Sequence, residues 1–411
     1  MDPKSVSIVD MPFLVLLAVL AVGAIVAGCV WARRLWTRLI ALSTGLLLVI
    51  ATVGAGINAH YDYFPTLGAL LGRRATDQVS TARFRELERL SIRRHPAVLG
   101  SRGTSRRATV DDASTAPTHG VVVPFVIPGV VSGFRGRTGQ VYVPPAWFQI
   151  PHPQLPVLEL LHGSPGSPAD WTRGGFADVT ADRFAAAHHG RAPIIVMPDV
   201  NGGWMRDTEC INGTRGNAET YLTVDVRMAV VARFGVSADR AAWGIGGLSE
   251  GGYCALELGL RHPDMFSVIG DFSGDDHPSV HGGLTKLFGV PEWRVARLEA
   301  QYDPRSQLAN WPRSRHRPLI WFSVGRGDHG TRFQVDGLYT MARADGFEAV
   351  FTLLGGGHTF RLWRAAFASA LPFMADHLAW ESSEPVRRSR GVRVTISRTT
   401  ARPPGYYRHG Q

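Results

Sequence analysis

Two long apolar stretches dominate the start of the chain, at 11–31 and 39–57, and neither contains a charged residue. A helix of about 20 apolar residues spans the hydrocarbon core of a bilayer, so each stretch is long enough to cross a membrane. The first stretch is longer than the apolar region of a signal peptide, and a second stretch follows it. The pattern therefore predicts two transmembrane helices rather than a cleaved signal.

The charges around these stretches predict their orientation. Arg33, Arg34 and Arg38 lie in the short connection, whereas the first ten residues carry one lysine and two aspartates. Because positively charged loops stay in the cytoplasm, we expect a multi-pass protein of the cell membrane whose remaining chain is extracytoplasmic. Three aromatic residues are then expected at the outer interface as anchors: Tyr61, Tyr63 and Phe64.

Polar and charged positions replace the apolar pattern after the membrane anchor, which we assign to 1–58. The stretch 75–94 predicts a charged helix, and the residues that follow it to 117 are mostly polar. We interpret 59–119 as a juxtamembrane helix and flexible spacer. The chain ends in a basic tail at 381–411, predicted to be disordered, whose last 27 residues contain seven arginines and no acidic residue.

Short apolar runs alternate with helix-length segments between 120 and 380. Strands are expected at 121–126, 139–143, 155–161, 193–197, 241–247, 266–269, 318–324 and 349–354, and helices at 221–231, 253–258 and 365–380. The first two strands flank a glycine-rich turn, as in an edge hairpin. This alternation is typical of a mostly parallel sheet with helices on both faces. The sequence therefore predicts an α/β catalytic domain at 120–380.

The net charge of +10 does not indicate a nucleic-acid partner. The arginines concentrate in the tail and in the segment 72–119, which holds ten arginines and five acidic residues. Arginine outnumbers lysine 42 to two, which points to a coding bias rather than to selection for phosphate contacts. A nucleic-acid-binding protein is expected to carry a compact basic face interleaved with aromatic residues, and no such pattern occurs.

The chain contains three cysteines. Cys29 lies in the first apolar stretch, where it is expected to pack. Cys210 and Cys254 lie in the α/β segment, and in an oxidising compartment they form either a disulfide or two buried thiols. No C-x-x-C or H-E-x-x-H spacing occurs, so no metal site is predicted.

The pentapeptide Gly-Leu-Ser-Glu-Gly at 247–251 stands between a predicted strand and a predicted helix. In this strand–turn–helix setting a serine becomes an exposed, strained nucleophile. Ser249 is therefore the candidate nucleophile. Serine needs a base to accept its proton and a carboxylate to orient that base.

Two strand ends downstream supply these partners. Asp328 follows the strand 318–324, and His358 follows the last strand and three glycines. Active residues of parallel sheets gather at the carboxyl ends of strands, so we expect both side chains near Ser249. His329 and Asp336 are the alternatives. The glycines favour His358 as the base, and Asp336 is expected within the next helix.

The developing oxyanion needs backbone donors. We expect them to be the N–H of Glu250 and that of Ser164, with Gly163 as the alternative to Ser164. The Glu250 carboxylate would oppose an anion, so it is expected to turn to solvent or to an arginine. Three tryptophans near predicted strand ends either line an apolar cleft or pack in the core: Trp171, Trp204 and Trp363.

The segments 247–256, 261–266 and 271–274 resemble the putative-esterase (esterase D) family, which includes the antigen 85 mycolyltransferases and the feruloyl esterases. The resemblance covers about 120–380. It implies an α/β-hydrolase fold, hydrolysis or transfer of acyl groups, no cofactor, and a triad of Ser249, Asp328 and His358. The antigen 85 proteins use a glutamate as the acid and are released from the membrane, and this chain departs from both features.

These observations favour a membrane-anchored, extracytoplasmic serine esterase that acts through an acyl-enzyme. Its expected substrate is a small-molecule or lipid ester of the membrane or cell envelope; acyl glycolipids and aminoacylated phospholipids both fit. Membrane lipids are the expected partners, and no protein partner is indicated. The alternatives are an acyltransferase of the mycolyltransferase type and a catalytically inactive, hydrolase-like envelope scaffold.

Overall fold

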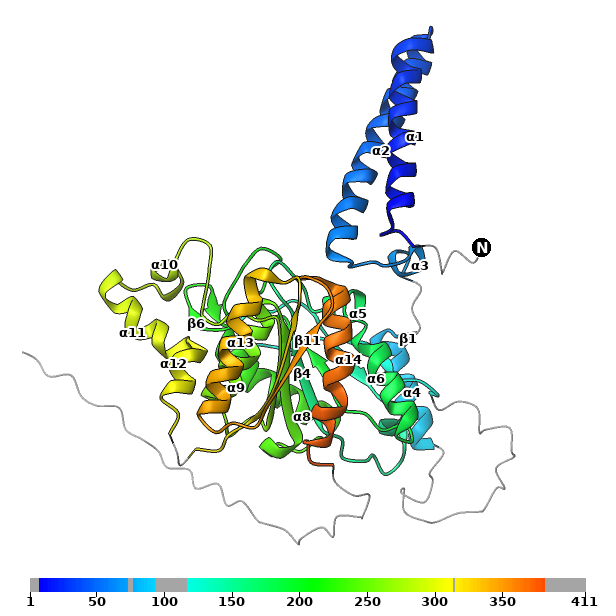
Figure 1. Cartoon of the computed structure of the whole chain (residues 1–411). Helices are drawn as coiled ribbons and strands as arrows, with labels where there is room; N and C mark the ends of the chain where they lie inside the picture. The colour runs from blue at the N-terminus through cyan, green and yellow to red at the C-terminus, as the bar shows by residue number, and fades with distance from the viewer. Residues whose placement is uncertain (1–6, 73–76, 94–116, 313–314, 381–411) are drawn as a thin grey trace, which may run out of the picture.

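A computed structural model of the chain describes residues 7–72, 77–93, 117–312 and 315–380 (Figure 1). The basic tail predicted at 381–411 lies outside the described residues, as does much of the predicted spacer. The described part of that spacer contains α3 (Leu67–Leu70), β1 (Asp77–Gln78) and α4 (Thr81–Arg93).

The two apolar stretches form a helical hairpin that projects from the rest of the molecule (Figure 1). Helix α1 (Met11–Val26) continues into a π-helical turn, η2 (Ala27–Trp31), and packs against α2 (Leu35–Tyr61). Both helices are long and apolar enough to cross a membrane, and most of their large side chains are exposed. Helix α2 extends beyond the predicted 39–57 at both ends, because hydropathy marks the apolar part of a helix and not where its hydrogen bonds stop.

A nine-stranded sheet forms the centre of the rest of the chain, in the order β1-β2-β3-β5-β4-β8-β9-β10-β11. Its other strands are β2 (Val121–Phe125), β3 (Gly139–Val143), β4 (Val157–Leu161), β5 (Ile194–Met197), β8 (Trp243–Leu248), β9 (Val268–Phe272), β10 (Leu319–Gly325) and β11 (Ala349–Leu354). In the described part of this sheet, β3 runs antiparallel to β2 and β5, and all other neighbouring strands are parallel. The predicted pair β2–β3 is antiparallel, but β1 pairs with β2 and forms the edge.

Helices cover both faces of this sheet. The main ones are α6 (Ala177–Ala187), α8 (Val226–Phe234), α9 (Glu250–Arg261), α13 (His329–Ala344) and α14 (Phe360–Asp376). Alternate residues of β4 belong to two separate buried clusters: Leu158 and Leu160 join α6 and α14, whereas Val157 and Leu161 join α8, α9 and α13. The predicted fold class, a mostly parallel sheet with helices on both faces, is therefore confirmed.

The remaining elements are short or peripheral: η5 (Pro145–Phe148), α5 (Asp170–Arg173), β6 (Asn212–Gly213), β7 (Gly216–Asn217), α7 (Ala218–Thr220), η6 (Tyr221–Asp225), η7 (Arg240–Ala242), α10 (Leu284–Phe288), α11 (Glu292–Tyr302) and α12 (Pro304–Ala309). The sequence did not predict α10 to α12. Helix α14 begins five residues before the predicted start at 365, and the side chains of this added turn, Leu362 and Trp363, are buried in the core.

The end of α2 is attached to the α/β fold by ion pairs. Asp62, which ends α2 in the left-handed conformation, is 4% exposed. Its Oδ2 lies 2.7 Å from Nε of Arg361 and 3.0 Å from Nη2 of Arg364, both in the first turns of α14. The hairpin therefore meets the molecule beside the start of α14.

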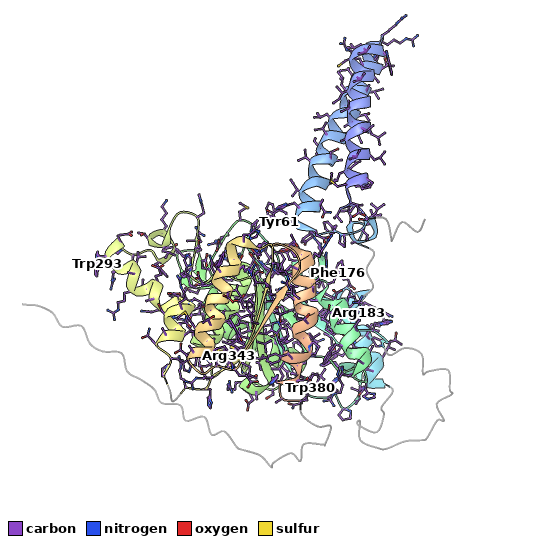
Figure 2. All side chains as sticks on the ribbon, viewed as in Figure 1. Tyr61, Phe176, Arg183, Trp293, Arg343 and Trp380 are labelled. Atoms are coloured by element: carbon purple, nitrogen blue, oxygen red, sulfur yellow. A yellow bond between two sulfur atoms is a disulfide. The ribbon has the colours of Figure 1, made fainter. Side chains whose placement is uncertain are left out.

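The aromatic residues expected as membrane anchors have different surroundings at this attachment. Tyr63 donates a hydrogen bond of 2.9 Å to Asp170, and its ring meets that of Phe360 edge-on at 4.7 Å. Tyr63 thus packs on the α/β fold, in contrast to the prediction, whereas Tyr61 is 47% exposed. Figure 2 shows Tyr61 and Phe176 where the hairpin meets the fold, with Trp380 at the opposite end.

Glu159 is a buried carboxyl in β4 that is fully shielded from solvent. Neither of its carboxyl oxygens has a hydrogen-bond partner within the described residues. Burial raises the pKa of Glu159 from its usual 4.5 to about 8, although the charge of Arg227 opposes this shift. The folded protein therefore keeps a proton that the unfolded chain releases near pH 4.5.

This difference predicts a pH-dependent stability. The free energy of unfolding is expected to fall as the pH rises from 4.5 to about 8, by on the order of 4 kcal/mol. Glu159→Gln removes this titration, so its melting temperature relative to the wild type should rise with pH across this window. Thermal unfolding at several pH values measures the effect, with the exposed Glu348→Gln as control. Equal pH dependence in all three proteins would contradict the prediction.

Candidate active site

Ser249 forms the whole turn between β8 and α9. Its backbone has φ 55° and ψ −127°, a conformation that non-glycine residues rarely adopt and that is typical of a nucleophile elbow. A Cβ at Gly247 would lie 1.8 Å from the carbonyl oxygen of Gly251, so this tight turn requires glycine there. The elbow therefore presents Ser249 at the carboxyl end of a central strand.

Two side chains from the ends of β10 and β11 form a hydrogen-bonded chain with Ser249. His358 Nε2 lies 2.9 Å from Ser249 Oγ, and His358 Nδ1 lies 2.8 Å from Asp328 Oδ2. Thr331 donates a hydrogen bond of 2.7 Å to the other Asp328 oxygen. The structure thus brings the three predicted side chains into one hydrogen-bonded row, in which an imidazole lies between a hydroxyl and a carboxylate.

The electrostatics of this row favour an ionised acid and an accessible base. Burial opposes ionisation of Asp328, but the hydrogen bond and charge of His358 and the hydrogen bond of Thr331 hold the pKa of Asp328 below its usual range. The His358 side chain is 37% exposed. The alternatives, His329 and Asp336, are exposed on α13, and within the described residues neither contacts Ser249 or His358.

The turn after β4 lies directly against the nucleophile. A Cβ at Gly163 would lie 3.1 Å from Ser249 Cβ, so the close approach favours glycine. Within the described part of the chain, neither the N–H of Glu250 nor that of Ser164 has a hydrogen-bond acceptor. Two donors next to Ser249 are therefore available for an anion.

A buried ionic network holds this turn, and the sequence analysis did not predict it. His162 Nδ1 lies 2.8 Å from the carbonyl oxygen of Gly163, and its Nε2 lies 3.1 Å from Asp199. Arg137 donates to both Asp199 oxygens, at 2.6 and 2.9 Å. Burial opposes ionisation of Asp199, but the hydrogen bonds of His162 and Arg137 hold its pKa well below the usual range. His162 and Asp199 each follow a strand end closely, which is the signal that could have found them.

The Glu250 side chain does not turn to solvent or to an arginine, as the sequence analysis expected. It is 6% exposed, and its Oε2 accepts a hydrogen bond of 2.9 Å from Asn201. The reason is its place at the first position of α9, where the side chain points back into the molecule toward the segment after β5.

Cys210 and Cys254 form a disulfide, one of the two arrangements that their sequence positions allowed. It joins the segment that follows Asp207 and Glu209 to the second turn of α9. This link holds that segment next to the helix that begins at Glu250.

The three tryptophans near strand ends have different environments. Trp171 is fully buried against Phe272 and Phe367, so it packs in the core. Trp363 is buried and meets the His358 ring edge-on at 4.9 Å. Trp204 is 65% exposed in the segment after β5.

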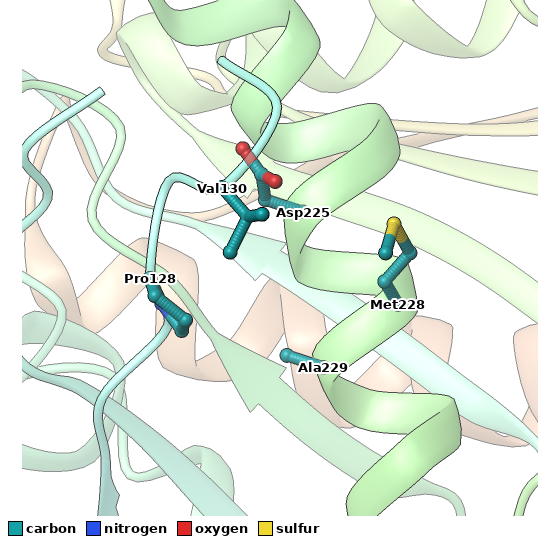
Figure 3. Close-up of a pocket in the computed structure, with 5 residues that line it drawn as sticks. All are labelled: Pro128, Val130, Asp225, Met228 and Ala229. Carbon is teal, nitrogen blue, oxygen red and sulfur yellow. The ribbon is translucent and has the colours of Figure 1, made fainter. Parts of the chain in front are cut away.

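A separate hollow lies over α8, away from this constellation. Its lining residues are Pro128, Val130, Asp225, Met228 and Ala229 (Figure 3). None of them is a nucleophile or a base paired with one, so this hollow is not the candidate site. Among the described residues, no group of three or more His, Cys, Asp or Glu side chains is arranged to hold a metal ion.

The chain is similar to a family of known proteins and to individual proteins. The family described as "Putative esterase" matches residues 134–374. An uncharacterized protein of Corynebacterium glutamicum is 30% identical over 342 residues, which are 82% of this chain and 76% of that protein. An acetyl esterase of Caldicellulosiruptor saccharolyticus is 24% identical over 239 residues, covering 54% of this chain and 84% of the esterase.

Solved structures show the same fold. A ferulic acid esterase superposes with a TM-score of 0.55 at 22% sequence identity, covering 64% of this chain and 99% of its own. At this identity the likeness concerns the fold alone. It agrees with the topology described above, in which β8, the strand before Ser249, lies at the centre of a mostly parallel sheet.

Proposed function

The chain belongs to the putative esterase family, and from this premise we propose that it is a membrane-anchored, extracytoplasmic serine esterase of lipid or cell-envelope esters. One observation carries the proposal: His358 Nε2 lies 2.9 Å from the hydroxyl of Ser249, which stands on a strained elbow at a strand end. A serine with a base at this distance has what nucleophilic acyl transfer requires.

The chemistry follows from the geometry. Ser249 Oγ attacks the ester carbonyl while His358 Nε2 accepts its proton, and the Asp328 carboxylate holds His358 in the tautomer with the proton on Nδ1. The N–H groups of Glu250 and Ser164 stabilise the oxyanion of the tetrahedral intermediate. His358 then gives the proton to the leaving alcohol. Water, activated by the same histidine, releases the acyl group from Ser249.

The attachment of the hairpin supports a substrate in the membrane. Asp62 and Tyr63, at the end of α2, contact Phe360, Arg361 and Arg364, which follow His358 by two to six residues. The carboxyl edge of the sheet, where Ser249 and His358 lie, is thus the edge beside the hairpin (Figure 1). If the hairpin spans the bilayer, the site stands close to the membrane surface, where ester lipids are concentrated.

A membrane-impermeant fluorophosphonate probe, applied to intact and to lysed cells, tests both parts of the proposal. Fluorophosphonates react with activated serines, so we expect labelling of the full chain in intact cells, recovery in the membrane fraction, and no labelling of Ser249→Ala. Labelling only after lysis would contradict the extracytoplasmic placement. Absence of labelling in both samples, with the protein present, would instead favour an inactive scaffold.

A further inference from the structure

Four carboxyl groups lie near the candidate nucleophile, and the proposed reaction uses none of them. They belong to Asp207, Glu209, Glu250 and Asp275. Glu250 directly follows Ser249 in the chain. Asp275 interacts electrostatically with both Glu209 and His358, so the group extends from the nucleophile to the base. We call these four residues the acidic cluster.

Glu250 is a buried member of the cluster. Only 6% of the residue is exposed, and Asn201 donates a hydrogen bond to Oε2. Its Oε1 meets no N–H or hydroxyl donor of another side chain or of the backbone within the described residues. Burial, the neighbouring charges of Asp207 and Glu209, and a side-chain hydrogen bond with Asp207 raise the pKa of Glu250. A buried carboxylate among other carboxylates needs either a proton or a cation.

The segment that carries Asp207 and Glu209 is held against α9 at an energetic cost. Glu209 and Cys210 both adopt positive φ angles, 51° and 55°, which non-glycine residues seldom adopt. The disulfide from Cys210 to Cys254 and the hydrogen bonds of Thr208 to the Val200 carbonyl and Cys210 N–H keep this shape. The fold therefore maintains carboxylates that repel one another next to Ser249.

The nearby cations do not form ion pairs with the cluster. Burial and the charges of Asp207 and Asp275 raise the pKa of Glu209, and the charge of Arg215 opposes this shift only in part. The Arg215 guanidinium donates its hydrogen bonds to the backbone carbonyls of Asp207 and His281. His277 and Arg305 pair with Asp276, which is outside the cluster. Within the described residues, no arginine or lysine forms an ion pair with a carboxyl group of the cluster.

The arrangement favours an organic cation over a metal ion. No three acidic or histidine side chains in the described segments are placed to coordinate a metal. An ammonium group needs only a few acceptor oxygens and surrounding negative charge, which spread carboxylates provide. Asp207 and Asp275 are half-buried, as is Ser249, so each of the three is partly accessible to a ligand.

We propose that the acidic cluster binds a positively charged amine of the substrate, so that the preferred esters carry an ammonium group close to the ester carbonyl. This inference rests on the proposed esterase function and names the substrate class of the same site. The Glu250 amide faces the oxyanion while its carboxylate faces the cation, which explains an acidic residue directly after the nucleophile.

Two isosteric pairs of esters test the preference on the full-length protein. Alanine methyl ester and methyl isobutyrate differ by exchange of an ammonium for a methyl group on the acyl side. Butyrylcholine and its carbon isostere, with tert-butyl in place of trimethylammonium, differ on the alcohol side. We expect the cationic member of at least one pair to be hydrolysed with a kcat/KM roughly tenfold higher or more. Ratios near one for both pairs would overturn the proposal.

Substitutions in the cluster connect this ratio to its cause. Asp207→Asn and Glu209→Gln are each expected to lower the cationic-to-neutral ratio about tenfold. The matched control is Glu348→Gln. This exposed residue directly precedes β11 and therefore lies at the amino ends of the parallel strands, opposite to Ser249. Two cluster positions are tested because the buried Glu209 variant could misfold, which circular dichroism detects. An unchanged ratio in a folded cluster variant would refute the assignment.

A binding measurement separates this proposal from the esterase proposal. In Ser249→Ala, which cannot form an acyl-enzyme, alanine methyl ester should raise the melting temperature more than methyl isobutyrate does. If no ester is hydrolysed but this difference is present, the esterase function fails and the cation site stands. If esters are hydrolysed but neither binding nor rate distinguishes the pairs, the cation site fails alone.

Discussion

Ser249→Ala is expected to lower kcat for p-nitrophenyl butyrate hydrolysis by about a millionfold, the loss typical of removing the nucleophile of a serine hydrolase. In the proposed mechanism the hydroxyl oxygen of Ser249 forms the acyl bond, and His358 Nε2 lies 2.9 Å from it. Alanine retains Cβ but has no oxygen for that bond. Steady-state kinetics on the purified full-length protein measure the effect.

Two controls separate the loss of the hydroxyl from a loss of folding. Thermal unfolding should be nearly unchanged, because the substitution removes one half-buried oxygen and leaves the strained backbone in place. Ser369→Ala, on the exposed face of α14, should hydrolyse the ester at the wild-type rate. Substantial activity in folded Ser249→Ala would remove Ser249 from its role.

Asp328→Asn is expected to reduce kcat by about ten thousandfold. The Asp328 carboxylate lies 2.8 Å from His358 Nδ1 and so favours the tautomer that leaves Nε2 free to accept the serine proton. An asparagine can present its amide N–H to Nδ1, which stabilises the opposite tautomer with the proton on Nε2. The loss should appear in kcat rather than in KM, because binding of the ester does not use this contact.

Asp336→Asn is the matched control, since it makes the same change at the other acid that the sequence offered. Asp336 is exposed on α13 and should be dispensable for hydrolysis. His329→Ala serves in the same way for the base. If Asp336→Asn lost activity while Asp328→Asn kept it, the acid would have to be reassigned despite the hydrogen bond to His358.

The two proposals of substrate class concern different features of the same site. The hairpin attachment sets the carboxyl ends of the strands beside the two apolar helices, and the acidic cluster is proposed to favour a cationic group next to the reacting carbonyl. Both features lie outside the hydrogen-bonded row of Ser249, His358 and Asp328. Under the two proposals, they select the ester that reaches Ser249 and take no part in breaking the ester bond.

Most of the order of strands along the chain can be predicted from the sequence. Strands β2 to β5 and β8 to β11 were expected within a few residues of their observed bounds, because short apolar runs between turns have few other stable arrangements. Parallel strands bring their carboxyl ends to one edge. The proximity of Ser249, Asp328 and His358 follows from that rule, and their catalytic roles are what the two substitutions test.

Long-range polar contacts could not be predicted in this way. Asp62 and Arg361 are 299 residues apart, and no periodic pattern connects them. The direction of the Glu250 side chain was expected wrongly, because a motif defines the backbone of the elbow and not the surroundings of each side chain. Helices α10 and α12 were missed because they have only five and six residues, too few for a helical repeat of apolar positions to be recognised.

The sequence by itself determined the class of fold, the family, the two apolar helices and the strand ends at which reactive side chains lie, because these depend on local periodicity and on short motifs. Only the tertiary structure decided which buried charges meet: His162 with Asp199, Asp62 with α14, and Glu250 with Asp207 and Glu209. The physical reason is that the energy of a buried charge depends on neighbours brought together from distant parts of the chain by packing of the core.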